Sequence, residues 1–192
     1  MVKLHNIKSW AVTAAPNTEP VTSTEVKLWA KIDTSADDAL ITNIIQAARE
    51  NAENFLNYKL ISQTVAEYFT EFPESRGELL LRFPLVSSIT SVAYVDTDGA
   101  NQTFTSYNAD LSGLPARLWP NTQTEWPGTK EQLKAVTVTY VCGYANAAAV
   151  PQAIKTAILL TIAKWYDNRE DSVRMLPTAA ERLLEPYRMK LY

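Results

Sequence analysis

Apolar side chains recur at helical spacing between about residues 36 and 56. Positions three and four apart share one face of a helix, and that face carries Leu40, Ile41, Ile44, Ile45, Ala48, Ala52, Phe55 and Leu56. Arg49, Glu50 and Glu53 fall on the opposite face. The pattern predicts an amphipathic helix over residues 36–56, with Thr34 or Ser35 as its N-cap.

Two further helix starts are marked by a threonine three residues before a glutamate. In such a capping box each side chain bonds a backbone N–H that the helix leaves unpaired. Thr22 and Glu25 predict a short helix to about residue 31, and Thr178 and Glu181 predict a final amphipathic helix near the other end of the chain.

A more apolar helix is predicted over residues 151–166. Pro151 suits a first helical position because its missing N–H would be unpaired there. Apolar residues then cover most of the helix circumference: Ile154, Ala157, Ile158, Leu160, Ile162, Ala163 and Trp165. A helix of this kind is buried in a bundle or in a subunit interface.

The middle of the chain has the two-residue period of β-strands. Asp98 and Gly99 form a hairpin turn signal, and residues 110–130 predict a long loop that is rich in Pro, Gly, Asn and Thr. Strands are predicted at about residues 65–71, 79–81, 89–95, 102–105 and 135–142.

This order of elements predicts an α+β protein, because strands and helices do not alternate as a parallel sheet requires. We expect a small helical bundle from both chain ends, residues 22–61 and 145–192, with an antiparallel β insertion over residues 62–144. Residues 1–21, with Pro16 and Pro20, predict an irregular, extended N-terminal arm.

Composition narrows the function classes. The chain of 192 residues is 46% hydrophobic and has a net charge of −3, so bulk attraction to nucleic acid is not expected. We expect no signal peptide, because Met1 to His5 lack its apolar stretch, and no apolar run reaches the roughly 18 residues of a membrane span. The single cysteine, Cys142, lies in an apolar strand, where we expect it in the core. We expect a protein of a reducing, aqueous compartment.

The sequence offers few combinations of side chains that could form a catalytic site. The only histidine, His5, lies in the predicted arm, which excludes a Ser-His-Asp triad or a Cys-His pair. No Cys/His cluster predicts a metal site, and no glycine-rich loop predicts a nucleotide cofactor. Paired carboxylates leave one enzymatic alternative: Glu67, Glu71 and Glu78 on one face of a sheet, as in glycosidases. A solvent-facing strand predicts the same pattern.

Other acidic residues have structural interpretations. Asp37 and Asp38 fit the negative charge that a helix N-terminus favours. Asp96, Asp98 and Asn101 resemble half a calcium loop, but position 107 is Tyr107 rather than the closing glutamate, so a turn is the better interpretation.

Aromatic residues leave a binding alternative. Trp119, Trp126, Tyr107 and Arg117 could stack sugars or single-stranded nucleic acid. Large aromatic side chains in a long loop also serve to pack the loop or to fill a partner's pocket. A carbohydrate- or single-strand-binding module that uses Trp119 and Trp126 therefore remains an alternative.

Several short segments are spread over almost the whole chain. They are residues 19–27 (EPVTSTEVK), 37–41 (DDALI) with 47–50 (AARE), 83–92 (FPLVSSITSV), 141–144 (VCGY) with 150–155 (VPQAIK), 165–170 (WYDNRE) and 183–188 (LLEPYR). In their order and spacing, though not singly, these segments resemble the head–tail connector, or adaptor, proteins of tailed bacteriophages and gene transfer agents.

The resemblance implies a non-enzymatic virion protein without cofactors. Such proteins form a ring, usually of twelve copies, under the portal protein at the head–tail junction, after synthesis in the host cytoplasm. The ring extends the DNA channel, which DNA passes without specific binding, and presents a surface to the next tail or stopper protein. No membrane is involved.

The final segment is the predicted portal-docking site. It combines aromatic, methionine and cationic side chains of the types enriched in interface cores: Tyr187, Arg188, Met189, Lys190, Leu191 and Tyr192. A terminus that lies on its own bundle is the alternative.

Overall fold

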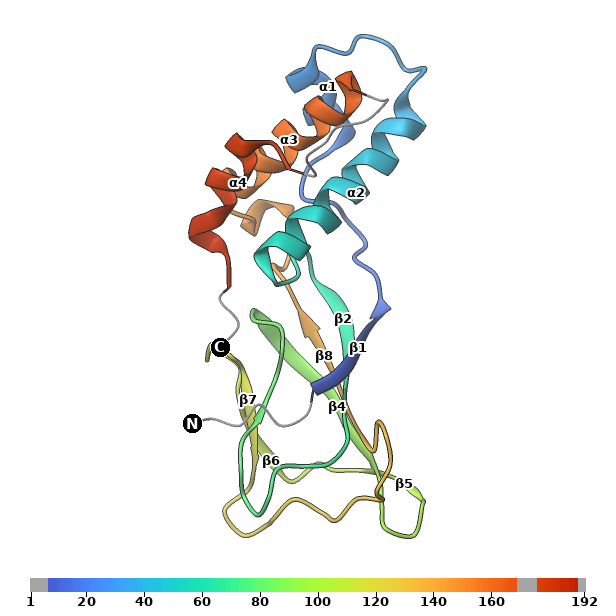
Figure 1. Ribbon diagram of the computed structural model, residues 1–192, viewed down its shortest axis with the longest axis vertical. Helices are drawn as coiled ribbons and strands as arrows, with labels where there is room; N and C mark the ends of the chain where they lie inside the picture. Colours follow the sequence, from blue (N-terminus) through green and yellow to red (C-terminus); the bar gives the residue numbers. More distant parts are fainter. Residues whose placement is uncertain (1–6, 169–175, 190–192) are drawn as a thin grey trace. The chain divides into compact units, whose positions relative to one another are not determined.

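The computed structural model describes residues 7–168 and 176–189 (Figure 1). The chain divides into two compact units. A β unit contains residues up to Pro16 and Ser62–Gly143, and a helical unit contains Asn17–Ile61 and the residues from Tyr144 onward. The chain therefore passes three times from one unit to the other, and each unit is built from segments far apart in sequence.

The helical unit contains α1 (Ser23–Ala30), α2 (Asp38–Leu56), α3 (Gln152–Asp167) and α4 (Thr178–Leu184), with 3₁₀ turns at Ala147–Ala149 and Glu185–Tyr187. The predicted capping box of α1 is confirmed: Thr22 Oγ1 accepts the Glu25 N–H at 3.2 Å, and the Glu25 carboxylate accepts the Thr22 N–H at 2.6 Å.

Helices from both parts of the sequence share one core. The apolar stripe of α2 buries Ile41, Ile45, Ala48, Ala52 and Leu56. The α3 helix supplies Ile154, Ala157, Ile158, Leu159 and Ile162 to the same unit, and α3 packs against α1, α2 and α4. The predicted burial of this very apolar helix is confirmed.

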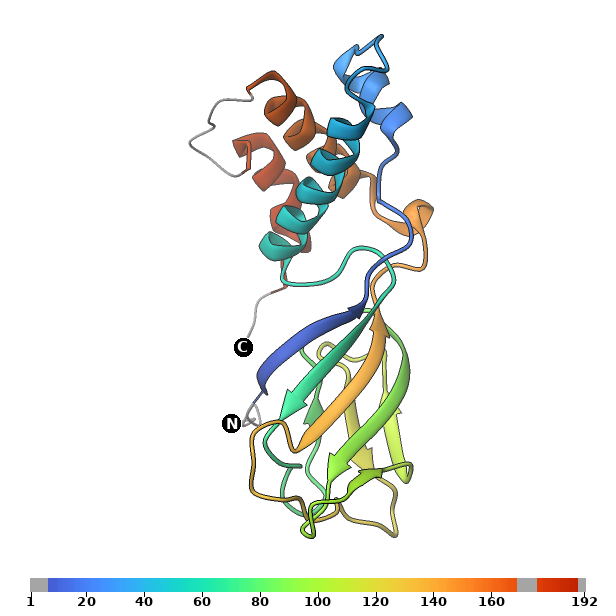
Figure 2. The ribbon, with the colours of Figure 1, turned by 90° about the vertical axis from the view of Figure 1, so that its right-hand side faces the viewer.

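The β unit contains two antiparallel sheets. Five strands lie in the order β1-β2-β8-β4-β5: β1 (Ile7–Ala14), β2 (Gln63–Phe69), β8 (Val136–Cys142), β4 (Val86–Val95) and β5 (Asn101–Thr103). Figure 2 shows the first four side by side. Three short strands form the second sheet, in the order β3 (Leu79–Leu80), β7 (Arg117–Pro120) and β6 (Tyr107–Asp110).

Strand β8 shows how the sequence period sets the core of the β unit. Val136, Val138, Tyr140 and Cys142 are buried, whereas the residues between them are half exposed. Cys142 is therefore a core residue, as predicted. The α+β class, with helices from both parts of the sequence packed together and an antiparallel β region between them, is also confirmed.

Several local predictions were wrong, and for the strands the reason is pairing with segments that are distant in the sequence. Residues 7–14, expected to be irregular, form an edge strand on β2, and the predicted loop at 110–130 contributes β7. The N-cap of α2 is Asp37 rather than Thr34 or Ser35, and that of α4 is Pro177, so Thr178 is already helical. His5 lies outside the described residues.

Candidate functional site and interaction surfaces

The three candidate catalytic carboxylates do not share an open face. Glu67 is wholly buried in β2, where its two oxygens accept the Arg82 N–H at 2.8 and 3.1 Å. Burial raises the pKa of the Glu67 carboxyl to about 8. Glu71 is exposed, and exposed Glu78 pairs with Arg117 at 3.4 Å. The expectation of solvent-facing carboxylates holds for Glu71 and Glu78 but was wrong for Glu67, because its side of β2 faces the core of the β unit.

The predicted aromatic site is largely an internal cluster. The Trp126 ring stacks on Phe72 at 4.6 Å and lies 5.1 Å from Phe104. Its Nε1–H donates to the Gly77 carbonyl at 2.8 Å. Because both its ring and its Nε1–H have partners within the protein, Trp126 holds its loop in place by packing. Trp119 lies half-buried in β7, so the two tryptophans do not form the exposed pair that a stacking site needs.

The acidic residues near Gly99 build a turn. The Asp96 carboxylate accepts the N–H groups of Asp98 and Ala100 and the side-chain amide of Gln102. The hydrogen bonds from Gln102 and Ala100 hold the pKa of Asp96 below its ordinary value. Gly99 has φ of +87° in this hairpin between β4 and β5, so the turn prediction is confirmed.

Within residues 7–168 and 176–189, no group of three or more His, Cys, Asp and Glu side chains is placed to hold a metal ion. None of the helices described there is long and apolar enough to span a membrane.

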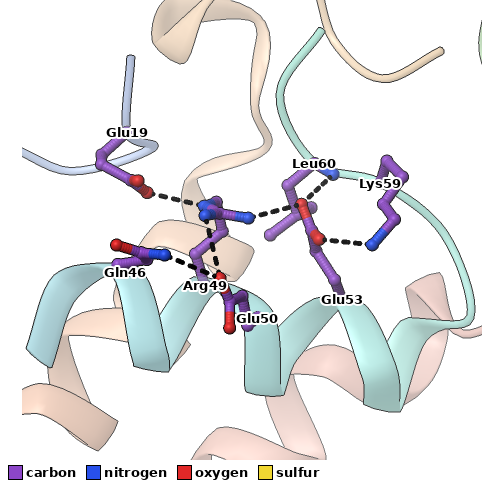
Figure 3. Close-up of polar contacts among 7 residues, drawn as sticks. All are labelled: Glu19, Gln46, Arg49, Glu50, Glu53, Lys59 and Leu60. Atoms are coloured by element: carbon purple, nitrogen blue, oxygen red, sulfur yellow. Dashed lines mark hydrogen bonds and ion pairs between the residues drawn. The ribbon is translucent and has the colours of Figure 1, made fainter. Parts of the chain in front are cut away.

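A buried ion network crosses the face of α2 that the sequence pattern marks as polar (Figure 3). Both charged residues are buried: Arg49 is 5% exposed and Glu53 is 3% exposed. Arg49 Nε lies 2.8 Å from Glu19 Oε2, and Arg49 Nη1 lies 3.4 Å from Glu53 Oε1. Glu53 also pairs with Lys59 Nζ at 3.1 Å. The expected polar face is therefore buried at two of its three named positions, and Glu50 alone of them is exposed.

This network was missed because its partners are distant in sequence or belong to the backbone. Glu19 lies 30 positions before Arg49, and Glu53 Oε1 also accepts the Leu60 N–H at 3.0 Å. Although burial by itself would lower the pKa of Arg49, the charges of Glu53 and Glu19 raise that pKa overall. This network fixes the segments that contain Glu19 and Lys59 on α2, and the partners of Arg49 and Glu53 all lie within the helical unit.

Exposed apolar side chains mark candidate interaction surfaces. On α1, Leu28 is 82% exposed and Trp29 is 47% exposed. In the β unit, edge strand β1 exposes Trp10 and Val12, and the loops expose Leu114 and Leu133. Aromatic and aliphatic side chains that are exposed on a surface are typical anchors of protein–protein contacts.

The described half of the predicted docking segment lies on the helical unit. The Met189 N–H donates to the Leu56 carbonyl at 2.9 Å, and the Met189 carbonyl accepts Asn57 Nδ2–H at 3.1 Å. The Arg188 guanidinium lies 5.0 Å from the Phe55 ring centre, and Tyr187 is exposed. Lys190, Leu191 and Tyr192 lie outside the described residues.

The mixed α+β fold and the exposed apolar side chains are features that a structural protein with partner-binding surfaces would have. The model of the head completion protein family matches residues 19–190. The chain belongs to this family, whose members are structural proteins and not enzymes. A search of the curated proteins finds no match.

Solved structures share the fold over nearly the entire chain at 18% sequence identity. One is a chain in the neck of an empty gene transfer agent (GTA) particle computed with C6 symmetry, with a TM-score of 0.79 over 96% of this chain and 97% of that one. A chain in the virion of a native GTA particle has a TM-score of 0.77 over 95% and 96%. A third, in the neck of a native GTA particle computed with C12 symmetry, has a TM-score of 0.69 over 91% and 96%.

Proposed function

We propose that this chain is a head–tail connector subunit of a tailed phage or phage-like particle. Copies of it form a ring, of twelve subunits, beneath the portal protein. The ring extends the DNA channel and binds the next tail or stopper protein, and its place is the neck of the virion. The observation that carries the proposal is the family match over residues 19–190, supported by the likeness of fold to neck chains of particles computed with C6 and C12 symmetry.

A ring of more than two copies needs a head-to-tail interface, in which two different surfaces of each subunit meet. We assign one of these surfaces to Leu28 and Trp29 on α1. Leu28 is the most exposed large apolar side chain of the described residues. A tryptophan beside it supplies the kind of anchor that dominates interface energies.

A separate contact, with the portal protein rather than with a neighbouring subunit, is assigned to the segment from Tyr187 to Tyr192. Tyr187 and Arg188 are exposed, and the Met189 backbone is held on α2 by the hydrogen bonds to Leu56 and Asn57. The segment beyond Met189 thus starts from a fixed point on the helical unit. DNA is expected to pass the ring without specific binding, in keeping with the net charge of −3.

The test is assembly on the portal. The purified chain is mixed with the portal protein of the same particle and followed by light scattering and negative-stain microscopy, with each component alone as a control. We expect an added ring of density on the portal. A chain that stays monomeric in the presence of the portal would contradict the proposal.

A matched pair of variants tests the assigned ring contact. Leu28→Asp places a charge on the α1 surface, and Leu133→Asp places the same charge on a loop leucine of similar exposure, 73% against 82%. We expect Leu28→Asp to abolish the ring without lowering the melting temperature and Leu133→Asp to leave assembly intact. Equal behaviour of the two variants would remove the assignment to α1.

A further inference from the structure

Three connections leave the helical unit, and they begin near Asn17, Ile61 and Tyr144. The first carries Glu19, whose carboxylate binds Arg49 of α2 at 2.8 Å. The second carries Lys59 and Leu60, and both are held by the carboxylate of Glu53, one turn further along the same helix. Two of the connections are therefore fixed by neighbouring side chains of α2.

The third connection is fixed through the second. The Tyr144 N–H donates to the Leu60 carbonyl at 3.1 Å, and Ile61 and Tyr144 form a parallel β-bridge. Since Glu53 holds the Leu60 N–H and Leu60 holds Tyr144, all three connections trace back to the contact between Arg49 and Glu53.

A buried ion pair adds little net stability as a rule. Burying two charges costs about as much as their attraction returns, and apolar residues of similar volume are often as stable or more so. Apolar side chains at the same positions would fill the space on α2 as well. They could not bind the Glu19 carboxylate, accept the Leu60 N–H or hold the Lys59 ammonium, so the charges are specific to holding the connections.

We propose that the pair Arg49–Glu53 is a clamp that couples the folding of the two units. By holding the first residues of every connection on α2, the clamp makes the opening of one unit release the anchorage of the other. Without the clamp, the connections are not fixed to α2, and each unit unfolds independently of the other. The clamp is a property of the monomer, so its test does not depend on whether the chain forms a ring.

The test uses the full chain and compares the double variant Arg49→Met/Glu53→Met with the control Lys27→Met. The control removes the ion pair of Lys27 with Asp38 in the same helical unit, which touches no connection. Hydrogen exchange reports the slowest amides of β8 and α3 separately, together with the amides of Leu60 and Tyr144.

In the unmodified protein and in the control, we expect the slowest amides of β8 and α3 to exchange through one common opening. In the double variant they should differ about tenfold or more, and the Leu60 and Tyr144 amides should exchange about tenfold faster. Trypsin should also cut after Lys59 correspondingly faster. If the double variant does not fold, Glu53→Gln is judged by the exchange of β8 and α3 and by trypsin cleavage after Lys59 alone, because it loses the charge that holds Arg49 and Lys59 but keeps an acceptor for the Leu60 N–H.

Two results would overturn the clamp. One is an unmodified protein whose two units already open separately. The other is a variant that loses stability while β8 and α3 still open together and the connections stay protected, which would make the pair a local stabilising contact.

Discussion

The strongest quantitative prediction concerns the pH dependence of stability, and it follows from the carboxyl group of Glu67, which is wholly buried in the β unit. Its ordinary pKa is 4.5, and burial raises that value to about 8 in the folded protein. The folded chain therefore keeps this proton up to about pH 8, whereas the unfolded chain releases it near pH 4.5. Between these values the folded state holds one more proton, so the free energy of unfolding falls as the pH rises. Below and above the window this group contributes no slope.

The size of the effect follows from the width of the window. One additional proton in the folded state lowers the free energy of unfolding by about 1.4 kcal/mol per pH unit. Across the window of Glu67 the loss is on the order of 5 kcal/mol. Glu67→Gln is neutral at every pH and keeps an oxygen that can accept the Arg82 N–H, so the variant should lack this slope.

The assay is urea unfolding of the unmodified chain and of Glu67→Gln at intervals from pH 5 to pH 9. The control is Glu71→Gln, which removes an exposed carboxylate just after the same strand. We expect the stability of Glu67→Gln relative to the unmodified chain to rise steadily up to about pH 8 and then level off, and the control to run parallel to the unmodified chain. Parallel curves for Glu67→Gln as well would refute a protonated buried Glu67.

Three further predictions concern other parts of the chain. Trp126→Ala should lower the free energy of unfolding by about 3–5 kcal/mol in urea, because it empties the space against Phe72 and Phe104; a loss below 1 kcal/mol would contradict the packing role. Thr22→Ala should cost about 1 kcal/mol through loss of the α1 cap, whereas Ser23→Ala, a neighbouring exposed control, should cost less. Deleting residues 190–192 should leave the melting temperature unchanged and weaken portal binding in a pull-down, by roughly 2 kcal/mol for each hot-spot side chain lost; unchanged binding would rule out docking by these three residues.

Local sequence signals were enough to predict the helices and most strands, although the capping box expected at Thr178 did not form. The α2 stripe and the alternation in β8 depend on neighbours within one or two turns or along one strand, so the sequence contains the whole signal. The same holds for the Thr22–Glu25 capping box, in which both partners lie within one helical turn. Cys142 was predictable for the same reason, since its inward position follows from the alternation of β8.

Features that depend on distant partners could not be predicted in this way. Arg49 and Glu53 have the spacing of a solvated helix face, and only the approach of Glu19 and Lys59 turns that face inward. Strand β1 was missed because an edge strand becomes regular only by pairing, and its partner residues in β2 lie 50 to 62 positions later in the chain. Glu67 looked exposed because alternation gives two faces but does not say which one is covered.

The division of the helical unit between two distant segments imposes an order on the chain during its synthesis. The β unit has all its strands once residue 143 is free, but α2 must wait for α3. Residues 144–167 take roughly 1 to 5 s to add at about 5–20 residues per second. For that time the apolar stripe from Ile41 to Leu56 is exposed to water, although the β unit already has all its strands. A nascent chain in this state is a natural client of ribosome-associated chaperones, and a stalled or truncated product that ends before α3 would aggregate through α2.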